Sequence, residues 1–284
     1  IGLLLPTRGV AQQTVERRVA VNRDAGVKIF VPTGSIRLIG WDRDSLVVTG
    51  TIALGQHFFF GVAPDGGKFG LEESGDSLGR VHASAASHLD VYLPMHGSAS
   101  LKAVTADVDA TGVSGWFYTV SGHIRLRGRA RTVEAEAMDG DIDIAITAPW
   151  VRARTGSGAL VLRGRVEDAS ASSISGPVTI TTAGITRGRF GSVTGNVTFA
   201  STLGTGGIFE FDNHSGTIDL RLPLTATGSF QLTTVKGTID NRLVALRPAS
   251  ISGGRGQALA FRIGSGGAHV TVRTFKGPIK LRHQ

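Results

Sequence analysis

Apolar and polar residues alternate along most of the chain within a short phrase that recurs. The phrase is a small polar residue, glycine, any residue and then an aliphatic residue. Successive phrases lie 18–21 residues apart, and their glycines are Gly122, Gly140, Gly158, Gly176, Gly195, Gly216 and Gly237. Numbered from this repeat glycine, positions −5, −2, +2 and +4 are mostly apolar, and polar residues stand between them. Alternation with a period of two is typical of strands with one buried face, so we expect these four positions to point inward.

A unit of 18–21 residues is too short to enclose a core, so successive units must stack on one another. Each strand would then hydrogen-bond to the equivalent strand of the next unit at ~4.8 Å. The repeat glycine would lie at a corner, where it can adopt backbone angles that other residues avoid. The pattern predicts an all-β fold: a single-chain β-solenoid (β-helix) of 18–21-residue coils with an N-terminal β cap. Eight consecutive coils are expected over residues 99–243, and Gly34 and Gly277 carry the same offsets nearer the two ends.

Departures from the repeat indicate how the chain is divided. Residues 1–15 begin with the apolar run Ile1–Leu5 and reach the small residues Gly9 and Ala11, as at the end of a secretory signal peptide. We expect a signal-peptide remnant or a disordered segment there, and an exported protein. Residues 16–98 are predicted to form an N-terminal coil and β cap with a mobile hairpin, because the end of a solenoid must be covered. Residues 99–284 are predicted to be the solenoid repeat domain, with an irregular coil at 244–268.

Composition excludes several classes of site and partner. The 284 residues include no cysteine, so there is no disulfide, zinc–cysteine site or thiol nucleophile. No apolar run approaches the ~20 residues of a membrane-spanning helix. The net charge of +8 favours an anionic partner. Nucleic acid is not favoured, because only 6% of the residues are aromatic and they do not alternate with arginines as stacking platforms would.

The side chains most suggestive of chemistry occupy positions +1 and +3 of three successive repeats, which we expect to face outward. They are Asp107, Asp109, His123, Arg125, Asp141 and Asp143. Stacked in order, they would place a base and a guanidinium between carboxylates ~9–10 Å apart. A β-helical polysaccharide lyase or hydrolase could use such a patch, and the acidic phrase 139–143 could contribute to a calcium site. We favour the structural alternative, because opposite charges on neighbouring strands stabilise an exposed face.

Arginines recur at position +5, just beyond the second strand of the repeat. They are Arg127, Arg163, Arg221 and Arg242. Along one edge they would form a basic stripe for an acidic glycan or a lipid headgroup. The alternative, which we favour, is a solvated rim, since the column is interrupted and charged residues at edges limit aggregation.

The phrase Gly-Ser-Ile-Arg-Leu-Ile-Gly-Trp-Asp-Arg at 34–43, the later Leu93-Pro94 and the serial Ser-Gly-x-Ile/Val-x-Leu units resemble a known family. It consists of bacterial exported β-strand-repeat proteins, described as putative adhesins and as a domain of unknown function. The resemblance covers residues 16–243. It implies a β-solenoid in the cell envelope or outside the cell, and it supplies no catalytic residue.

These observations lead to a functional hypothesis without an active site or a cofactor. We expect a non-enzymatic, exported β-solenoid that presents an extended surface for binding or adhesion, at the cell surface, in the periplasm or outside the cell. The partner would be a protein or an anionic glycan of the envelope, and self-association is open. One alternative is a carbohydrate-active β-helix that uses the patch from Asp107 to Asp143. Another is a structural, self-assembling envelope protein.

Overall fold

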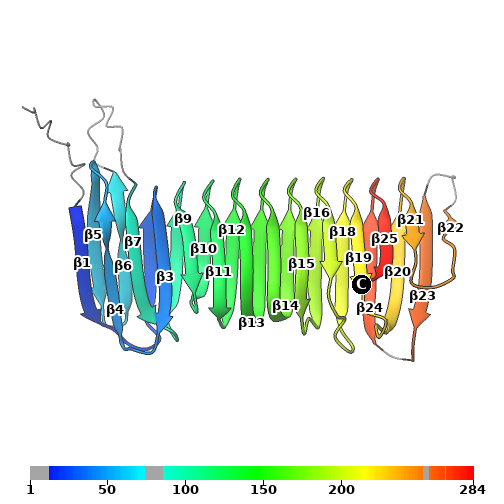
Figure 1. Cartoon of the computed structure of the whole chain (residues 1–284), viewed down its shortest axis with the longest axis horizontal. Coiled ribbons are helices and arrows are strands. Elements are labelled where there is room, and N and C mark those ends of the chain that lie inside the picture. The colour runs from blue at the N-terminus through cyan, green and yellow to red at the C-terminus, as the bar shows by residue number, and fades with distance from the viewer. Residues whose placement is uncertain (1–12, 74–85, 252–255, 266) are drawn as a thin grey trace, which may run out of the picture.

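The computed structural model describes residues 13–73, 86–251, 256–265 and 267–284, and all regular structure within them is β-strand. The strands hydrogen-bond into one 25-stranded sheet. They lie side by side across the long axis of an elongated molecule (Figure 1). The all-β fold that the alternating pattern predicted is therefore confirmed.

The sheet consists of two ladders of strands. The pre-glycine ladder contains the strands before the repeat glycine, in the stack order β5 (Gln56–Ala63), β6 (Gly66–Glu73), β2 (Gly26–Val31), β8 (Ser98–Ala103), β10 (Ser114–Thr119), β12 (Thr132–Ala137), β13 (Ile142–Thr155), β14 (Leu160–Ser173), β16 (Arg187–Ser192), β18 (Ile208–Asn213), β24 (Ala268–Thr274), β20 (Gly228–Thr234), β23 (Gln257–Ile263) and β22 (Ala249–Ser250). The post-glycine ladder contains β1 (Gln13–Ala20), β4 (Ser45–Ile52), β7 (His88–Pro94), β3 (Ser35–Trp41), β9 (Asp107–Thr111), β11 (Ile124–Arg129), β13, β14, β15 (Val178–Ala183), β17 (Val197–Ala200), β19 (Ile218–Leu222), β25 (Ile279–His283) and β21 (Ile239–Asn241). Strands β13 and β14, of 14 residues each, belong to both ladders and connect them.

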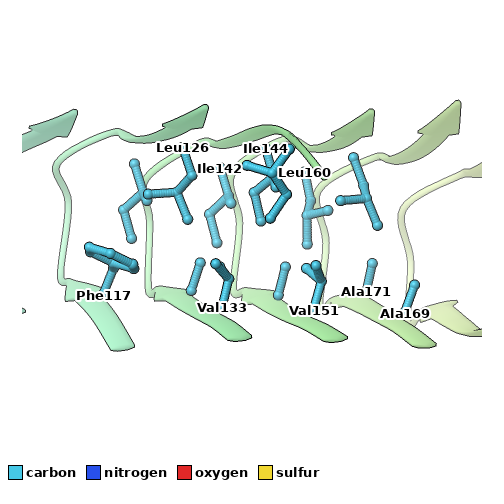
Figure 2. Close-up of a cluster of buried hydrophobic side chains, with 14 of the residues drawn as sticks. Phe117, Leu126, Val133, Ile142, Ile144, Val151, Leu160, Ala169 and Ala171 are labelled. Carbon is cyan, nitrogen blue, oxygen red and sulfur yellow. The ribbon is translucent and has the colours of Figure 1, made fainter. Parts of the chain in front are cut away.

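The core fills the space between the two ladders. Side chains at +2 and +4 of the post-glycine ladder face those at −5 and −7 of the pre-glycine ladder (Figure 2). In the middle repeats these are Phe117, Leu126, Val133, Ile142, Ile144, Val151, Leu160, Ala169 and Ala171, none more than 2% exposed. Each repeat buries its side chains against its neighbours as well as across the core, so stability depends on stacking.

Position −2 is not inward, and that prediction is wrong. Met138, Ile174 and Val193 are 55%, 63% and 47% exposed. Each strand of the pre-glycine ladder ends at −3, so its inward side chains are those at −7, −5 and −3. Position −2 already belongs to the turn, where its side chain points to solvent. The inward predictions at −5, +2 and +4 are confirmed.

Small polar side chains fill position −3, where the sequence pattern suggested no buried residue. Thr119, Ser173 and Ser192 are buried and accept hydrogen bonds from the amides of their own repeat glycines at 3.0, 2.8 and 3.0 Å. Thr234 does the same at 2.8 Å. A buried amide without a partner costs free energy, and each hydroxyl supplies the acceptor for the amide of its repeat glycine.

The repeat glycine is needed for space and not for a special backbone angle. None of the seven repeat glycines has a positive φ. A Cβ on Gly158 would stand 2.1 Å from the carbonyl oxygen of Gly140, and one on Gly176 only 1.8 Å from that of Gly158. The stacked turns approach so closely that no side chain fits between them, which corrects the predicted reason for glycine at the corner.

The order of the stack differs from the order of the sequence at both ends. From β8 to β19 the repeats follow one another in sequence. However, β24 pairs with β18 on one side and β20 on the other, and β25 likewise lies between β19 and β21 (Figure 1). The prediction of eight consecutive coils over 99–243 is therefore wrong. At the other end β2 lies between β6 and β8, and β3 lies between β7 and β9.

Antiparallel strands close both ends of the stack. Strands β1 and β5 pair antiparallel with β4 and β6 at one end, and β23 pairs antiparallel with β20 at the other. The segment 244–268, predicted as an irregular coil, supplies β22 and β23. The insertion of the first and last repeats leaves both edges of each paired, and the outermost strands of the two ladders are β5, β22, β1 and β21.

Some predictions fall on parts of the chain that the structure does not describe. They are residues 1–12 of the predicted signal-peptide remnant, residues 74–85 of the predicted cap, and residues 252–255 and 266 of the predicted irregular coil. The division into a cap and a repeat domain at residue 98 and the mobility of the hairpin stay predictions.

Candidate binding surface

A row of alternating charges runs along the outside of the post-glycine ladder at position +3. The structure brings Asp109, Arg125 and Asp143 together on β9, β11 and β13. Strands β3 and β7 continue the row with Arg37 and Asp90, whose side chains pair at 2.8 Å. Arg37 stands at +3 from Gly34, so the repeat contained the signal for it. The insertion of β3 between β7 and β9 was needed to connect it to the row.

Residues at position +1 form a second row, in which carboxylates bind the backbone of the next repeat. Asp107 accepts a hydrogen bond from the amide of His123 at 2.9 Å, and Asp141 accepts one from the amide of Ala159 at 2.7 Å. The Nδ1 atom of His123 lies 3.7 Å from an oxygen of Asp141. These charge-assisted hydrogen bonds satisfy amides at the turn and stabilise the stacking of one repeat on the next.

A shallow groove of about 250 Å³ opens along these rows. Its polar lining consists of His123, Arg125, Asp141, Asp143 and Arg163. Asp143 lies between Arg127 and Arg163, at 3.9 and 3.5 Å. The groove offers donors and acceptors of both signs to a polar ligand. No group of three or more side chains suited to hold a metal ion occurs within the part of the chain that the structure describes.

The arginines at position +5 fall into two separate groups. Arg127 and Arg163 flank Asp143, with Ala145 between them in the column. Arg221 and Arg242 lie on either side of Arg282, which sequence reasoning missed although it stands at +5 from Gly277. Its position depends on the insertion of β25 between β19 and β21. The continuous stripe along one edge does not form, because shorter side chains separate the two groups.

Asp219 binds two arginines of the second group. Its carboxylate is only 8% exposed and accepts hydrogen bonds from the Nε atoms of Arg221 and Arg282, both at 2.9 Å. Burial raises the pKa of Asp219, but the hydrogen bonds from Arg282 and Arg221 and their charges lower it by more, so this pKa lies below its ordinary value. The ionised carboxylate therefore stabilises the docking of β25 against β19.

We expect Asp219→Asn to reduce the free energy of unfolding at neutral pH by about 1.5–3 kcal/mol, the range for a hydrogen bond to a charged group. Because the folded-state pKa is depressed, this stabilisation is present above the unfolded-state value of about 3.9 and is lost as the pH falls through the folded-state pKa. Urea unfolding at several pH values should thus show the wild type and the variant converging below about pH 4. Asp240→Asn, which removes an exposed pair with Arg242, should change stability by less than about 0.5 kcal/mol. Unfolding curves that stay equally far apart at all pH values would contradict this role for the charge.

The pre-glycine ladder carries a second groove that sequence reasoning missed. It has a volume of about 380 Å³ and lies over β13, β14, β16 and β18. Its polar and aromatic lining includes Trp150, Arg152, Asp168, Ser170, Arg187, Arg189 and Glu210. These residues occupy positions −8 and −6 of successive repeats, so the sequence alone could have placed them in columns. They were missed because no single residue type fills either column.

Comparison with known proteins finds similarity at the level of the fold. No protein family matches the chain, and no curated protein sequence matches it. A solved structure described as a putative lipid binding protein from Parabacteroides distasonis is 12% identical with a TM-score of 0.57, over 95% of this chain and 96% of that one. A putative adhesin from Bacteroides fragilis is 11% identical, with a TM-score of 0.48 over 97% of this chain and 99% of that one. A putative cell adhesion protein from Clostridium sporogenes is 10% identical, with a TM-score of 0.25 over 96% of this chain and 100% of that one.

The first of these structures shows that the fold is shared over nearly the whole of both chains. Within the described residues there is no helix of the length and apolar character needed to cross a membrane.

Proposed function

We propose that the chain is an exported, non-enzymatic β-solenoid that presents an extended surface for binding or adhesion in the bacterial cell envelope. The observation that carries the proposal is the register of the outward side chains. From β8 to β19 each strand pairs in parallel with the equivalent strand one repeat away, so equivalent outward positions follow one another along both ladders. Such a surface, with a step of ~4.8 Å, suits an extended partner better than a small substrate.

The partners of the four carboxylates support binding over catalysis. Asp107 and Asp141 accept hydrogen bonds from backbone amides, while Asp109 and Asp143 pair with arginines of neighbouring strands. Polysaccharide hydrolysis requires carboxyl groups that are free to act as acid, base or nucleophile. The net charge of +8 favours an anionic partner, for which an acidic envelope glycan is the leading candidate.

The test is direct binding of the labelled chain to intact bacterial cells, to extracted envelope polysaccharide, and to vesicles of phosphatidylcholine with and without phosphatidylglycerol. We expect saturable binding to the cells and the polysaccharide that weakens as salt is raised, because salt screens exposed charges. Binding to the vesicles that contain phosphatidylglycerol would show that the anionic partner is a lipid and not a glycan. Absence of binding to all of these would contradict the proposal, and degradation of the polysaccharide that Asp141→Asn abolishes would show an enzyme instead.

A self-assembling envelope protein is the second candidate, and the exposed apolar column at −2 favours it. Met138, Ile174, Val193 and Val235 lie along the turns and are each about half exposed. Gly156 stands between the first two, and His214 and Phe275 stand between the last two, so only Ile174 and Val193 are direct neighbours. Exposed apolar patches of this kind often mark protein interfaces. Light scattering over a range of concentrations distinguishes the two functions, since a chain that stays monomeric does not assemble through this column.

A further inference from the structure

The second groove, on the pre-glycine ladder, has the shape of a ligand site. Its volume of about 380 Å³ falls in the range of about 300–1,000 Å³ that is typical of small-ligand pockets. It crosses four neighbouring strands, over which Trp150, Asp168, Arg187 and Ile208 form one outward column. In the adjacent column Ser170 lies between Arg152 and Arg189. Its side chain is shorter than those of the two arginines, so it leaves space for the groove between them. The groove spans three strand spacings, or about 14 Å, so it suits a short stretch of a linear chain.

Arg152 is the cation in this groove that is least engaged by the protein. Arg187 pairs with Asp168 at 2.9 Å and Arg189 pairs with Glu210 at 3.0 Å, whereas the nearest carboxylate to Arg152 is Glu134, at 3.8 Å. The Nε–H of Arg152 is buried and donates to no group within the described part of the chain. The side chain as a whole is 41% exposed and lines the groove, so its guanidinium is accessible to an anion there.

The ring of Trp150 holds this guanidinium in place and adds an apolar wall. The guanidinium carbon of Arg152 lies 5.7 Å from the centre of the indole ring, a cation–π contact. Three arginines and two carboxylates line the groove, so its lining carries a net charge of +1, and Glu134 outside the lining is a loose partner of Arg152 at 3.8 Å. The carboxylates and the hydroxyl of Ser170 can bind hydroxyl groups, while the indole packs against the C–H face of a sugar ring.

From these features we infer that the Trp150–Arg152 groove binds a sugar that bears a carboxylate, as part of a hexuronate-containing glycan. The carboxylate of the sugar pairs with Arg152, its ring lies against Trp150, and its hydroxyls bind Asp168, Glu210 and Ser170. This inference rests on the proposed binding function and assigns to it a site and a class of ligand.

The experiment is calorimetric titration of the full chain with trigalacturonate and with the neutral trisaccharide maltotriose. We expect trigalacturonate to bind at least about tenfold more tightly than maltotriose, and Arg152→Gln to weaken its binding by about tenfold, as expected for loss of a charge-assisted contact. Arg154→Gln is the matched control, because Arg154 lies on the same side of β13 but outside the groove. It removes the same charge and should change binding by less than about twofold. Trp150→Ala should weaken the binding of both trisaccharides.

Equal binding by the two arginine variants, or equal binding of the acidic and neutral trisaccharides, would overturn the inference. Absence of trigalacturonate binding would overturn it as well. In each case the proposed function would be judged separately, from the binding of wild-type chain to cells and to envelope polysaccharide. Unfolding midpoints of the variants show whether a loss of binding reflects the groove or a loss of folding.

Discussion

Replacement of Gly176 by alanine is expected to lower the free energy of unfolding by about 3 kcal/mol or more, at the upper end of the range for overpacking. The added Cβ would stand 1.8 Å from the carbonyl oxygen and 2.6 Å from the carbonyl carbon of Gly158. Both are backbone atoms of the turn below, so no side chain can move aside. Separation of the two turns would strain neighbouring hydrogen bonds, such as that from the amide of Ser175 to the carbonyl of Gly156 at 2.8 Å.

Urea unfolding followed by far-ultraviolet circular dichroism measures this effect. Gly61→Ala is the matched control, because Gly61 lies in β5 with a non-positive φ. Among the described residues, only the Lys68 carbonyl oxygen, at 3.9 Å, is near the position of its Cβ. It should leave stability within about 0.5 kcal/mol of the wild type. Stability depends on contacts between neighbouring repeats, so the Gly176 variant should also unfold less cooperatively. Similar unfolding midpoints for the two variants would show that the turns can separate without cost.

Removal of residues 267–284 should have a still larger effect, because it takes out a repeat that is paired on both sides near one end of the stack. Val270, Val272, Ile279 and Leu281 are at most 1% exposed, and full burial of such side chains contributes about 1.5–3 kcal/mol each. The sum is comparable with the whole stability of a typical domain. The deletion also leaves β18 and β20 without the strand that pairs with both. We expect the strands β20 to β23 to unfold and the truncated chain to aggregate through the exposed edge of β18.

Size-exclusion chromatography and thermal unfolding of the truncated chain test this expectation. A chain that begins at Val21 is the control, since it loses β1, which among the described strands pairs with β4 alone and whose one buried residue is Val15. If the full chain is monomeric, that control should also be monomeric in the same buffer. Its unfolding temperature should be only modestly lower. A truncated chain that ends at residue 266 and unfolds at the temperature of the full chain would show that the inserted repeat is not needed.

The candidate site was predicted in part, because it combines local and long-range information. The row of Asp109, Arg125 and Asp143 follows from neighbouring repeats that stack in sequence order, and it was visible in the repeat. Arg37 and Arg282 come from the repeats that are inserted out of order, so their neighbours could not be read from sequence position. The groove beside Trp150 depends on the short side chain of Ser170 between two arginines. The sequence contains many outward positions, and nothing in it marked this one.

The sequence by itself determined the strand character, the repeat length and most of the buried columns. The reason is local: a strand has a side-chain period of two, so positions −5, +2 and +4 could be assigned from alternation alone. The tertiary structure decided where strands end. As a result, the small polar residues at −3 are buried, and the apolar residues at −2, which were predicted to be buried, are exposed. It also decided why glycine is needed and where the terminal repeats lie. Both depend on the close approach of one turn to the next and on the pairing of open strand edges, which are contacts between distant parts of the chain.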